Sequence, residues 1–386
     1  IPDSANGVYV LQHDITFGGD RFWYDEFLDR VFIANSPVRE WRDEDDTKAT
    51  VEIIDAYGVR RLSSHVVREC VLFVARQRTR HCIRDWLTSL VWDEVPRITT
   101  AFEDYWGTAS DDYTRAASAN FFIGLAARIL KPGCKLDTMC VFEGPQGIKK
   151  SSALEVLGGD WYSASHETVG SKDFLQGLRG KWLMEIAELQ SFAKADKRAI
   201  KNTLSTRNDD YRKSHGRHVK RYPRECVFAG TTNADDWGDD DSGLRRFWPI
   251  TCGAIDLELL KAAREQLFAE AVAAVRAGAT WWEMPSSAAE VQADRQSHDE
   301  WTSKVRDYLH TQPPHTDIRI IDILVNGLKF QVSACGKGEQ MRVARILRLE
   351  RWERRKLRNG NSTDWVWFEG ENIDEGGNGG NDVFVP

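Results

Sequence analysis

The chain contains no uninterrupted apolar run near the ~20 residues that a membrane-spanning helix requires. Its N-terminus also lacks the basic and then apolar order of a secretory signal. Both absences predict a cytoplasmic location. The first stretch, beginning at Ile1, reads as the interior of a longer protein, and we expect residues 1–20 to be irregular.

Paired cysteine motifs are also missing. The seven cysteines are an odd number, widely scattered and without any Cys-x-x-Cys. This pattern argues against both a disulfide framework and a zinc site. We therefore expect reduced, partly buried thiols.

Positive charge is in the minority, because the formal net charge is −7. That balance argues against a nucleic-acid partner, but net charge conceals patches, and the basic residues of this chain are clustered. With 386 residues, 41% of them hydrophobic and 29% charged, the chain has the composition of a soluble protein of two or three domains.

A short apolar run at 138–142 precedes a glycine-rich turn and a Lys-Ser pair that opens a helical stretch. Strand, loop and helix in this order are the context of a phosphate-binding loop. Its glycines let backbone N–H groups point inward, Lys150 reaches the outer phosphates, and Ser151 can ligate magnesium. The predicted nucleotide-binding residues are Gly144, Pro145, Gln146, Gly147, Ile148, Lys149, Lys150, Ser151 and Ser152.

Lys149 departs from the motif Gly-x-x-x-x-Gly-Lys-Ser/Thr, which has glycine at this position. The loop must therefore tolerate a side chain there or bind phosphate less well. We expect Lys150 to be exposed in the empty loop. The alternative interpretation is an incidental surface turn.

The run at 181–188 is an apolar strand with acids at or just beyond its end. In phosphate-loop enzymes an acid there holds magnesium and a second one polarises the attacking water. Glu185 and Glu188 are the candidates for both roles, and their spacing leaves the assignment open. A solvated strand edge is the alternative.

A third apolar strand, 226–232, ends at Asn233, which can orient the attacking water or simply start a turn. Arg245 and Arg246 follow, between an acidic turn and another apolar strand. Two arginines there are suited to reaching a γ-phosphate, in the same subunit or a neighbour. An intramolecular salt bridge is the other interpretation.

Between the strands at 181–188 and 226–232, residues 195–204 read as a basic helix, and residues 207–222 combine positive charge and aromatic rings around Gly216. This is the layout of a hairpin tip that contacts a phosphate backbone and stacks on bases. The DNA-binding candidates here are Arg212, Lys213, His215, Arg217 and Lys220. A charged surface loop is the alternative.

The motifs described above lie in a predicted ATPase core over 135–285. Before it, hydrophobic spacing predicts a helical supporting domain over 21–134, including one long helix over 111–130. A polar helical connector is expected over 286–316, and a disordered Gly- and Asn-rich tail over 371–386.

Residues 317–370 predict a winged-helix module, with helices at 318–328 and 340–349 and a hairpin at 351–368 turning at Asn359-Gly360. Basic residues are dense here, and Arg351, Arg354 and Arg355 are the candidate DNA contacts. A solvated charged face is the alternative.

Four motifs together resemble the virulence-associated protein E family of phages and mobile elements, which is similar to superfamily 3 helicases. They are the loop at 142–151, the strand with Glu185 and Glu188, the run 230–233, and the run 243–249. Trp92, Asp93, Arg97 and 132–135 also resemble it, so the likeness covers residues 80–285.

The resemblance implies an α/β P-loop NTPase core related to AAA+ proteins, with ATP and Mg²⁺ bound between subunits of a ring, expected to be a hexamer. By resemblance, Lys150 and Ser151 bind the nucleotide, Glu185 and Glu188 form the acidic motif, and Asn233 is the sensor. Arg245 or Arg246 is then the arginine finger that acts across a subunit boundary.

The leading hypothesis is a DNA helicase or translocase of phage or mobile-element replication in the bacterial cytoplasm, hydrolysing ATP. The hairpin would track single-stranded DNA and the winged helix would engage duplex DNA; a primase is a further candidate partner. The alternative is a DNA-binding regulatory or phage-interference protein with a weakly active ATPase site.

Overall fold

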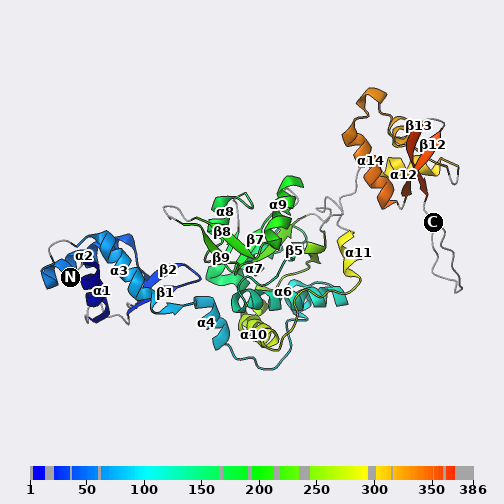
Figure 1. The fold of residues 1–386 in the computed structure, drawn as a ribbon. Helices are drawn as coiled ribbons and strands as arrows, with labels where there is room; N and C mark the ends of the chain where they lie inside the picture. The colour runs from blue at the N-terminus through cyan, green and yellow to red at the C-terminus, as the bar shows by residue number, and fades with distance from the viewer. Residues whose placement is uncertain are drawn as a thin grey trace, which may run out of the picture. The chain divides into compact units, whose positions relative to one another are not determined.

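The computed structural model describes residues 3–13, 21–34, 37–59, 62–164, 168–189, 194–212, 218–233, 244–293, 301–313, 316–350, 352–359 and 362–369. Two compact units divide the chain, residues 1–296 and 297–386. Figure 1 shows the elements of each unit. The predicted tail, 371–386, lies outside the described residues.

A five-stranded parallel sheet forms the centre of the first unit. The strand order is β11 (Phe247–Thr251), β5 (Met139–Glu143), β10 (Val227–Thr232), β7 (Leu183–Ile186) and β6 (Tyr162–Ala164). Every residue of β5, β7 and β10 is buried, as expected for strands covered on both faces. The predicted mixed α/β architecture is confirmed.

Helices cover both faces of this sheet (Figure 1). One cluster of buried side chains joins the sheet to α4 (Cys82–Ser89), α5 (Ala101–Trp106), α6 (Asp112–Leu130), α7 (Lys150–Gly158) and α10 (Leu257–Arg276). A second cluster joins it to α8 (Lys172–Gly177) and α9 (Lys194–Ser205). The boundary predicted at 134/135 therefore falls inside one hydrophobic core.

The start of the chain differs from the prediction. Helix α1 (Asp3–His13) occupies part of the stretch expected to be irregular, and α2 (Asp43–Tyr57) and α3 (Ser64–Arg76) pack with it around a separate core. The domain predicted to be helical also holds a four-stranded sheet. Its order is β3 (Arg39–Glu40), β2 (Arg30–Ile33), β1 (Phe22–Asp25) and β4 (Thr79–Arg80).

The error arises at Phe22–Ile33, where apolar residues three and four apart suggested a helix. Asp29 adopts a φ of 59° and reverses the chain, so that Phe22 pairs with Ile33 in an antiparallel hairpin. Apolar positions on two strands joined by a short turn can reproduce helical spacing by coincidence.

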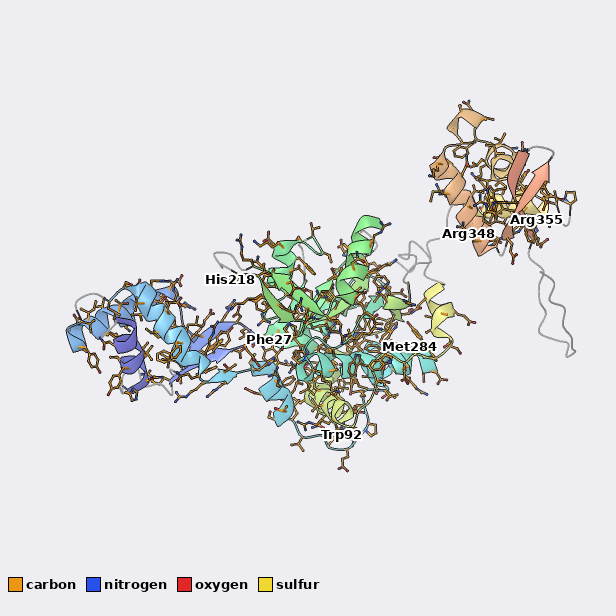
Figure 2. The ribbon with its side chains drawn as sticks, viewed as in Figure 1. Phe27, Trp92, His218, Met284, Arg348 and Arg355 are labelled. Carbon is orange, nitrogen blue, oxygen red and sulfur yellow. The ribbon has the colours of Figure 1, made fainter. Side chains whose placement is uncertain are left out.

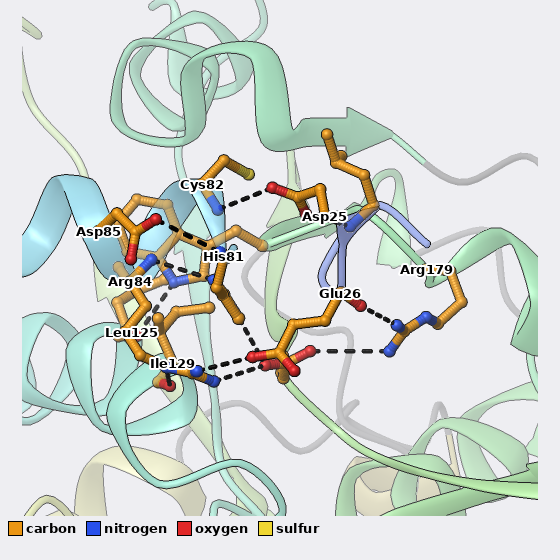
Figure 3. Close-up of polar contacts among 12 residues, drawn as sticks. Asp25, Glu26, His81, Cys82, Arg84, Asp85, Leu125, Ile129 and Arg179 are labelled. Atoms are coloured by element: carbon orange, nitrogen blue, oxygen red, sulfur yellow. Dashed lines mark hydrogen bonds and ion pairs between the residues drawn. The ribbon is translucent and has the colours of Figure 1, made fainter. Parts of the chain in front are cut away.

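A polar network connects this small sheet to the central one (Figure 3). Buried His81 contacts Glu225 through Nε2 at 2.8 Å, and the guanidinium of Arg84 donates to Glu26 at 2.7 Å. Arg179 lies 3.6 Å from Glu225 and also donates to the backbone carbonyl of Glu26. Charged groups that flank the two sheets therefore pair with one another, with His81 buried and Arg84 and Glu26 partly exposed.

The second unit contains α12 (Trp301–His310), α13 (Ile320–Asp322) continued by a π-turn over Ile323–Gly327, and α14 (Lys337–Leu349). Strands β12 (Trp352–Asn359) and β13 (Ser362–Glu369) pair antiparallel, and Ile318 forms a β-bridge with Trp367. Helix α12 packs in this core, so part of the predicted connector belongs to the unit itself. Ile318 is therefore not the helix start that the sequence suggested.

Two global expectations can be checked. All seven cysteines are free thiols, as predicted. No helix within the described ranges has both the length and the apolar character to cross a membrane.

Candidate nucleotide site

The strands of the central sheet are parallel, so their carboxyl ends lie at the same end of the sheet. Several segments meet at this edge, which the carboxyl ends form. Glu143 at the end of β5 pairs with Thr232 near the end of β10, and β10 pairs in turn with β7. Loop 144–149, Asn233 and Glu188 each follow the carboxyl end of one of these strands. Ligands of open α/β sheets bind at this edge, so the predicted residues meet where chemistry is expected.

The glycine-rich loop takes three backbone conformations that favour glycine. Gly144, Gly147 and Lys149 have φ values of 143°, 87° and 72°. A Cβ atom on Gly144 would lie 2.8 Å from Ile148 Cδ1 and 3.1 Å from the Cys252 carbonyl oxygen, so this glycine is required for space as well. At Lys149 the chain tolerates a side chain, which is exposed, in a left-handed conformation that costs about 1–2 kcal/mol.

Lys150 is only 7% exposed, and the expectation that it stands free in the loop is wrong. Its Nζ donates to the carbonyl oxygens of Gly144 at 2.6 Å and Pro145 at 2.9 Å, and to Asn233 Oδ1 at 3.0 Å. Burial lowers the pKa of this amine. Lys150 is the first residue of α7, so the loop curls around it and the helix N-terminus points at the same space.

Glu185 is the centre of a second set of contacts and is 1% exposed. Its Oε1 accepts hydrogen bonds from Ser151 Oγ at 2.7 Å and Thr231 Oγ1 at 2.6 Å. Its Oε2 accepts one from the hydroxyl of Tyr162. Burial, and then the bond to Glu185, raise the pKa of Tyr162 well above its usual value, so the phenol stays protonated and donates.

Tyr162 and Thr231 were not identified from the sequence as site residues. Thr231 belongs to the motif at 230–233, two residues before Asn233, and no role was assigned to it. Tyr162 begins β6, an edge strand whose pairing with β7 brings it to Glu185. No local signal marks such a residue, because its role depends on strand order.

Glu188 differs from Glu185 in its surroundings. It lies two residues beyond β7, is exposed, and has a φ of 54°. A non-glycine residue in this region carries local strain, which often marks functional positions. Of the two acids, Glu185 therefore contacts Ser151, and Glu188 is exposed beyond the end of β7.

Arg245 and Arg246 lie at the opposite end of the sheet, where the strands begin. They end a 3₁₀ turn (Leu244–Arg246) just before β11, whose first residue, Phe247, pairs with Met139 at the start of β5. Five residues of β11 at about 3.3 Å each separate them from the phosphate-loop edge by about 16 Å. Both line a cavity of about 690 Å³ together with Lys135 and Trp282. Arg246 Nε also donates to Ser205 Oγ at 3.1 Å.

The expected basic hairpin exists as β8 (Asn208–Tyr211) and β9 (Lys220–Pro223), which pair antiparallel. Arg212 and Lys220 flank its tip and are exposed, and His218 marks its position in Figure 2. Three of the candidate DNA contacts lie outside the described residues: Lys213, His215 and Arg217.

In the second unit, Arg354 and Arg355 are exposed on β12, and Arg351 lies outside the described residues. Nη2 of Arg355 donates to both carboxylate oxygens of Asp317, at 2.7 and 2.8 Å. Arg354 instead stacks on Trp365, with its guanidinium carbon 3.9 Å from the ring centroid.

Comparison with solved structures shows similarity to the apo structure of the NrS-1 C-terminal region, residues 305–718. The identity is 12% and the TM-score 0.47, over 90% of this chain and 96% of that one. A second structure, the A form of the apo NrS-1 C-terminal region, matches with 14% identity and a TM-score of 0.45 over the same shares. No curated protein sequence matches the chain.

A protein-family model matches more than half of the chain. Residues 87–300 match the virulence-associated protein E-like domain. This range includes the glycine-rich loop, Glu185, Glu188, Asn233, Arg245 and Arg246. The chain belongs to the virulence-associated protein E-like family.

Proposed function

We propose that this chain is a DNA-dependent ATPase, a helicase or translocase of phage or mobile-element replication built on a P-loop NTPase core. One observation carries the proposal: Lys150 and Ser151 come from the start of α7, Glu185 from β7 and Asn233 from the end of β10, and hydrogen bonds link them pairwise at one sheet edge. A phosphate-loop ATPase needs this combination of cation, hydroxyl, carboxylate and amide.

The residues fit a magnesium ion. Mg²⁺ prefers oxygen ligands, and Ser151 Oγ lies 2.7 Å from a carboxylate oxygen of Glu185. When bound with ATP, the ion would neutralise charge that develops on the phosphates. Ser151 and Glu185 would hold it, while Lys150 would contact the outer phosphates from the mouth of the loop.

Water activation is assigned to the exposed groups. Glu188 projects from the same sheet edge, and Asn233 is already aligned by the ammonium of Lys150. We assign Glu188 to polarise the attacking water and Asn233 to orient it. Positioning and charge stabilisation then supply most of the rate enhancement.

The site needs a second copy of the chain. Arg245 and Arg246 lie about 16 Å along the sheet from the phosphate-loop edge, too far to contact the nucleotide of their own subunit. Both line an open cavity, which suits an approach by the nucleotide of a neighbour. This arrangement is heterologous, and such contacts form a ring when the rotation between subunits closes and a filament when it does not. We propose a hexameric ring with arginine fingers acting between subunits.

Two surfaces are assigned to DNA. The β8–β9 hairpin, with exposed Arg212 and Lys220, would follow single-stranded DNA. The second unit has the order helix, short bridge strand, helix, helix and hairpin, which is that of a winged helix. Lys337, Gln340, Met341, Arg342 and Arg348 are exposed on α14, and these mostly polar and basic side chains suit a major groove.

ATP turnover with and without single-stranded DNA, measured beside the mass of the particle, tests the proposal. We expect turnover that DNA stimulates, in a ring-sized particle. Lys150→Ala should abolish turnover while the fold is retained, as judged by circular dichroism. Normal turnover in this variant would show that the phosphate site is misassigned.

A mixing experiment tests the composite site. Neither Lys150→Ala nor the double variant Arg245→Ala, Arg246→Ala should turn over ATP alone; loss of a finger lowers the rate by roughly 10³-fold or more. Mixed rings should regain part of the activity, because some interfaces pair an intact loop with intact arginines. The control combines all three substitutions in one chain, which cannot complement the Lys150→Ala chain in the same way.

The alternative, a regulatory or interference protein with a weak ATPase site, drew its support from Lys149. The loop accommodates this residue with its side chain in solvent. DNA binding without measurable ATP turnover, in particles of the expected mass, would favour that alternative.

A further inference from the structure

The β12–β13 hairpin presents two different faces. Lys356 pairs with Trp365 and Arg354 with Trp367 in the antiparallel register, so these four residues lie on one face. Trp367 is 2% exposed and packs in the core of the second unit. Trp365 is one step nearer the turn, beyond that core, and is 46% exposed. The core face of the hairpin therefore continues outward as an open aromatic surface.

Two cations contact this exposed indole. The Arg354 guanidinium carbon is 3.9 Å from the centroid of Trp365, and Lys356 Nζ is 5.1 Å from it. Both cationic side chains are exposed. Cation–π attraction at exposed sites is worth only about 0.5–1 kcal/mol, so both side chains can exchange the ring for a stronger partner.

The other face of the hairpin has a different character. Arg355 is on this face, where its Nη2 donates to both oxygens of Asp317 and its guanidinium carbon lies 4.6 Å from the centroid of Phe368. Arg355 is thus paired with an acid on its own face. The ion pairs among the described residues include neither Arg354 nor Lys356, and Glu369 lies on the same face as Trp365.

We propose that Trp365 is a stacking site for one unpaired DNA base, with Arg354 and Lys356 binding the flanking phosphates. The inference rests on the proposed DNA binding of the second unit and specifies which DNA it prefers. A flat half-exposed ring accepts a base of any sequence, whereas a base inside a duplex has both faces covered by its neighbours. The unit would therefore select a junction between duplex and single strand.

This preference arises because the two surfaces of the unit would bind different parts of the DNA, one the duplex and the other an unpaired base. The exposed side chains of α14 suit a duplex groove and contribute charge to any DNA. Stacking on Trp365 is available only where a strand is open, and such stacking changes affinity by roughly five- to a hundredfold per base. The hairpin would thus hold the unit at the point where strands separate.

The test compares the full-length chain on two DNAs with equal numbers of phosphates, a blunt duplex and a duplex with a single-stranded extension. The first unpaired base is 2-aminopurine, whose fluorescence falls when it stacks. We expect tighter binding to the extended DNA and quenching of the probe. Trp365→Leu, which keeps apolar contact with the hairpin, should remove the preference and the quenching, whereas Trp365→Phe should retain most of both.

Arg355→Ala is the matched control, because it removes one positive charge from the neighbouring position on the opposite face. This substitution should lower the affinity for both DNAs by the same factor and leave the preference for the extended DNA unchanged. Equal wild-type affinity for the two DNAs, or a preference that survives Trp365→Leu, would overturn the stacking site while DNA binding stands. Failure of the wild type to bind either DNA would overturn both proposals.

Discussion

Lys149 shows how one residue can depart from a motif without destroying the loop. Its φ of 72° costs about 1–2 kcal/mol for a residue with a Cβ atom. Lys149→Gly removes that strain, but glycine also raises the conformational entropy of the unfolded chain, which lowers the free energy of unfolding by about 0.5–1 kcal/mol. We expect a net stabilisation of about 0.5 kcal/mol in thermal unfolding, with equal or faster ATP turnover.

Lys149→Ala distinguishes the effect of backbone strain from that of the side-chain charge, because alanine keeps the strained conformation and lacks the ammonium group. It should leave the stability unchanged. A large loss of turnover in both variants would instead assign a catalytic role to the Lys149 ammonium.

Tyr162 is the residue that fixes the orientation of Glu185, since Ser151 and Thr231 both donate to the other carboxylate oxygen. Tyr162→Phe leaves Oε2 without this donor in a buried site. Loss of such an outer partner typically weakens metal affinity or activity by 10- to 100-fold. We expect the Mg²⁺ concentration for half-maximal ATP turnover to rise by about this factor, with ATP binding in the absence of metal unchanged.

An equal loss of metal-free ATP binding in Tyr162→Phe would mean that the tyrosine only supports the fold. Thr231→Val provides a comparison at the same carboxylate, on its other oxygen.

Among the elements, α2 has a start that depends on pH. The Asp45 carboxylate accepts from the backbone N–H of Arg42 at 2.8 Å and from Arg39 in two bonds of 2.6 Å. The hydrogen bond from Arg39 is the main cause that lowers the pKa of Asp45. Because the folded pKa lies below the unfolded one, this stabilisation is complete above about pH 4 and is lost as pH falls through the folded pKa.

We therefore expect Asp45→Asn to destabilise the small N-terminal core by about 1 kcal/mol at pH 7, a value reduced because Arg39 is partly exposed. The difference from wild type should shrink towards acid pH. Urea unfolding at pH 7 and near pH 3 measures it. A difference of the same size at both values would show that the charge of Asp45 does not matter.

At the scale of the whole molecule, the two units have separate hydrophobic cores. No cluster of buried side chains within the described residues contains members from both sides of residue 296. A fragment ending at residue 296 should therefore fold and keep basal ATP turnover, while it loses affinity for duplex DNA. Calorimetry, turnover and DNA binding of the fragment check this expectation.

Loss of the ATPase in that fragment, with its unfolding transition intact, would show that the second unit contributes to the nucleotide site. Salt dependence adds a measurement on the full chain. Each phosphate contact that the second unit makes with duplex DNA should add about 0.9 to the log-log slope, and the fragment should lose those contacts.

The amino-acid sequence alone determined the features that are encoded locally. The phosphate loop depends on adjacent residues, with Gly144 and Gly147 supplying φ values that they alone adopt without strain, and the hairpin β12–β13 follows from one turn signal. The family, too, was predicted from four short motifs whose order is a property of the chain.

Only the tertiary structure decided which residues meet across strands. The contact of Tyr162 with Glu185, the burial of Lys150 and the separation of Arg245 from the phosphate loop all follow from the strand order β11-β5-β10-β7-β6. Likewise, the hairpin at Phe22–Ile33 could not be distinguished from a helix by spacing. Strand pairing joins residues far apart in the chain, and its free energy comes from burial that no local window of sequence contains.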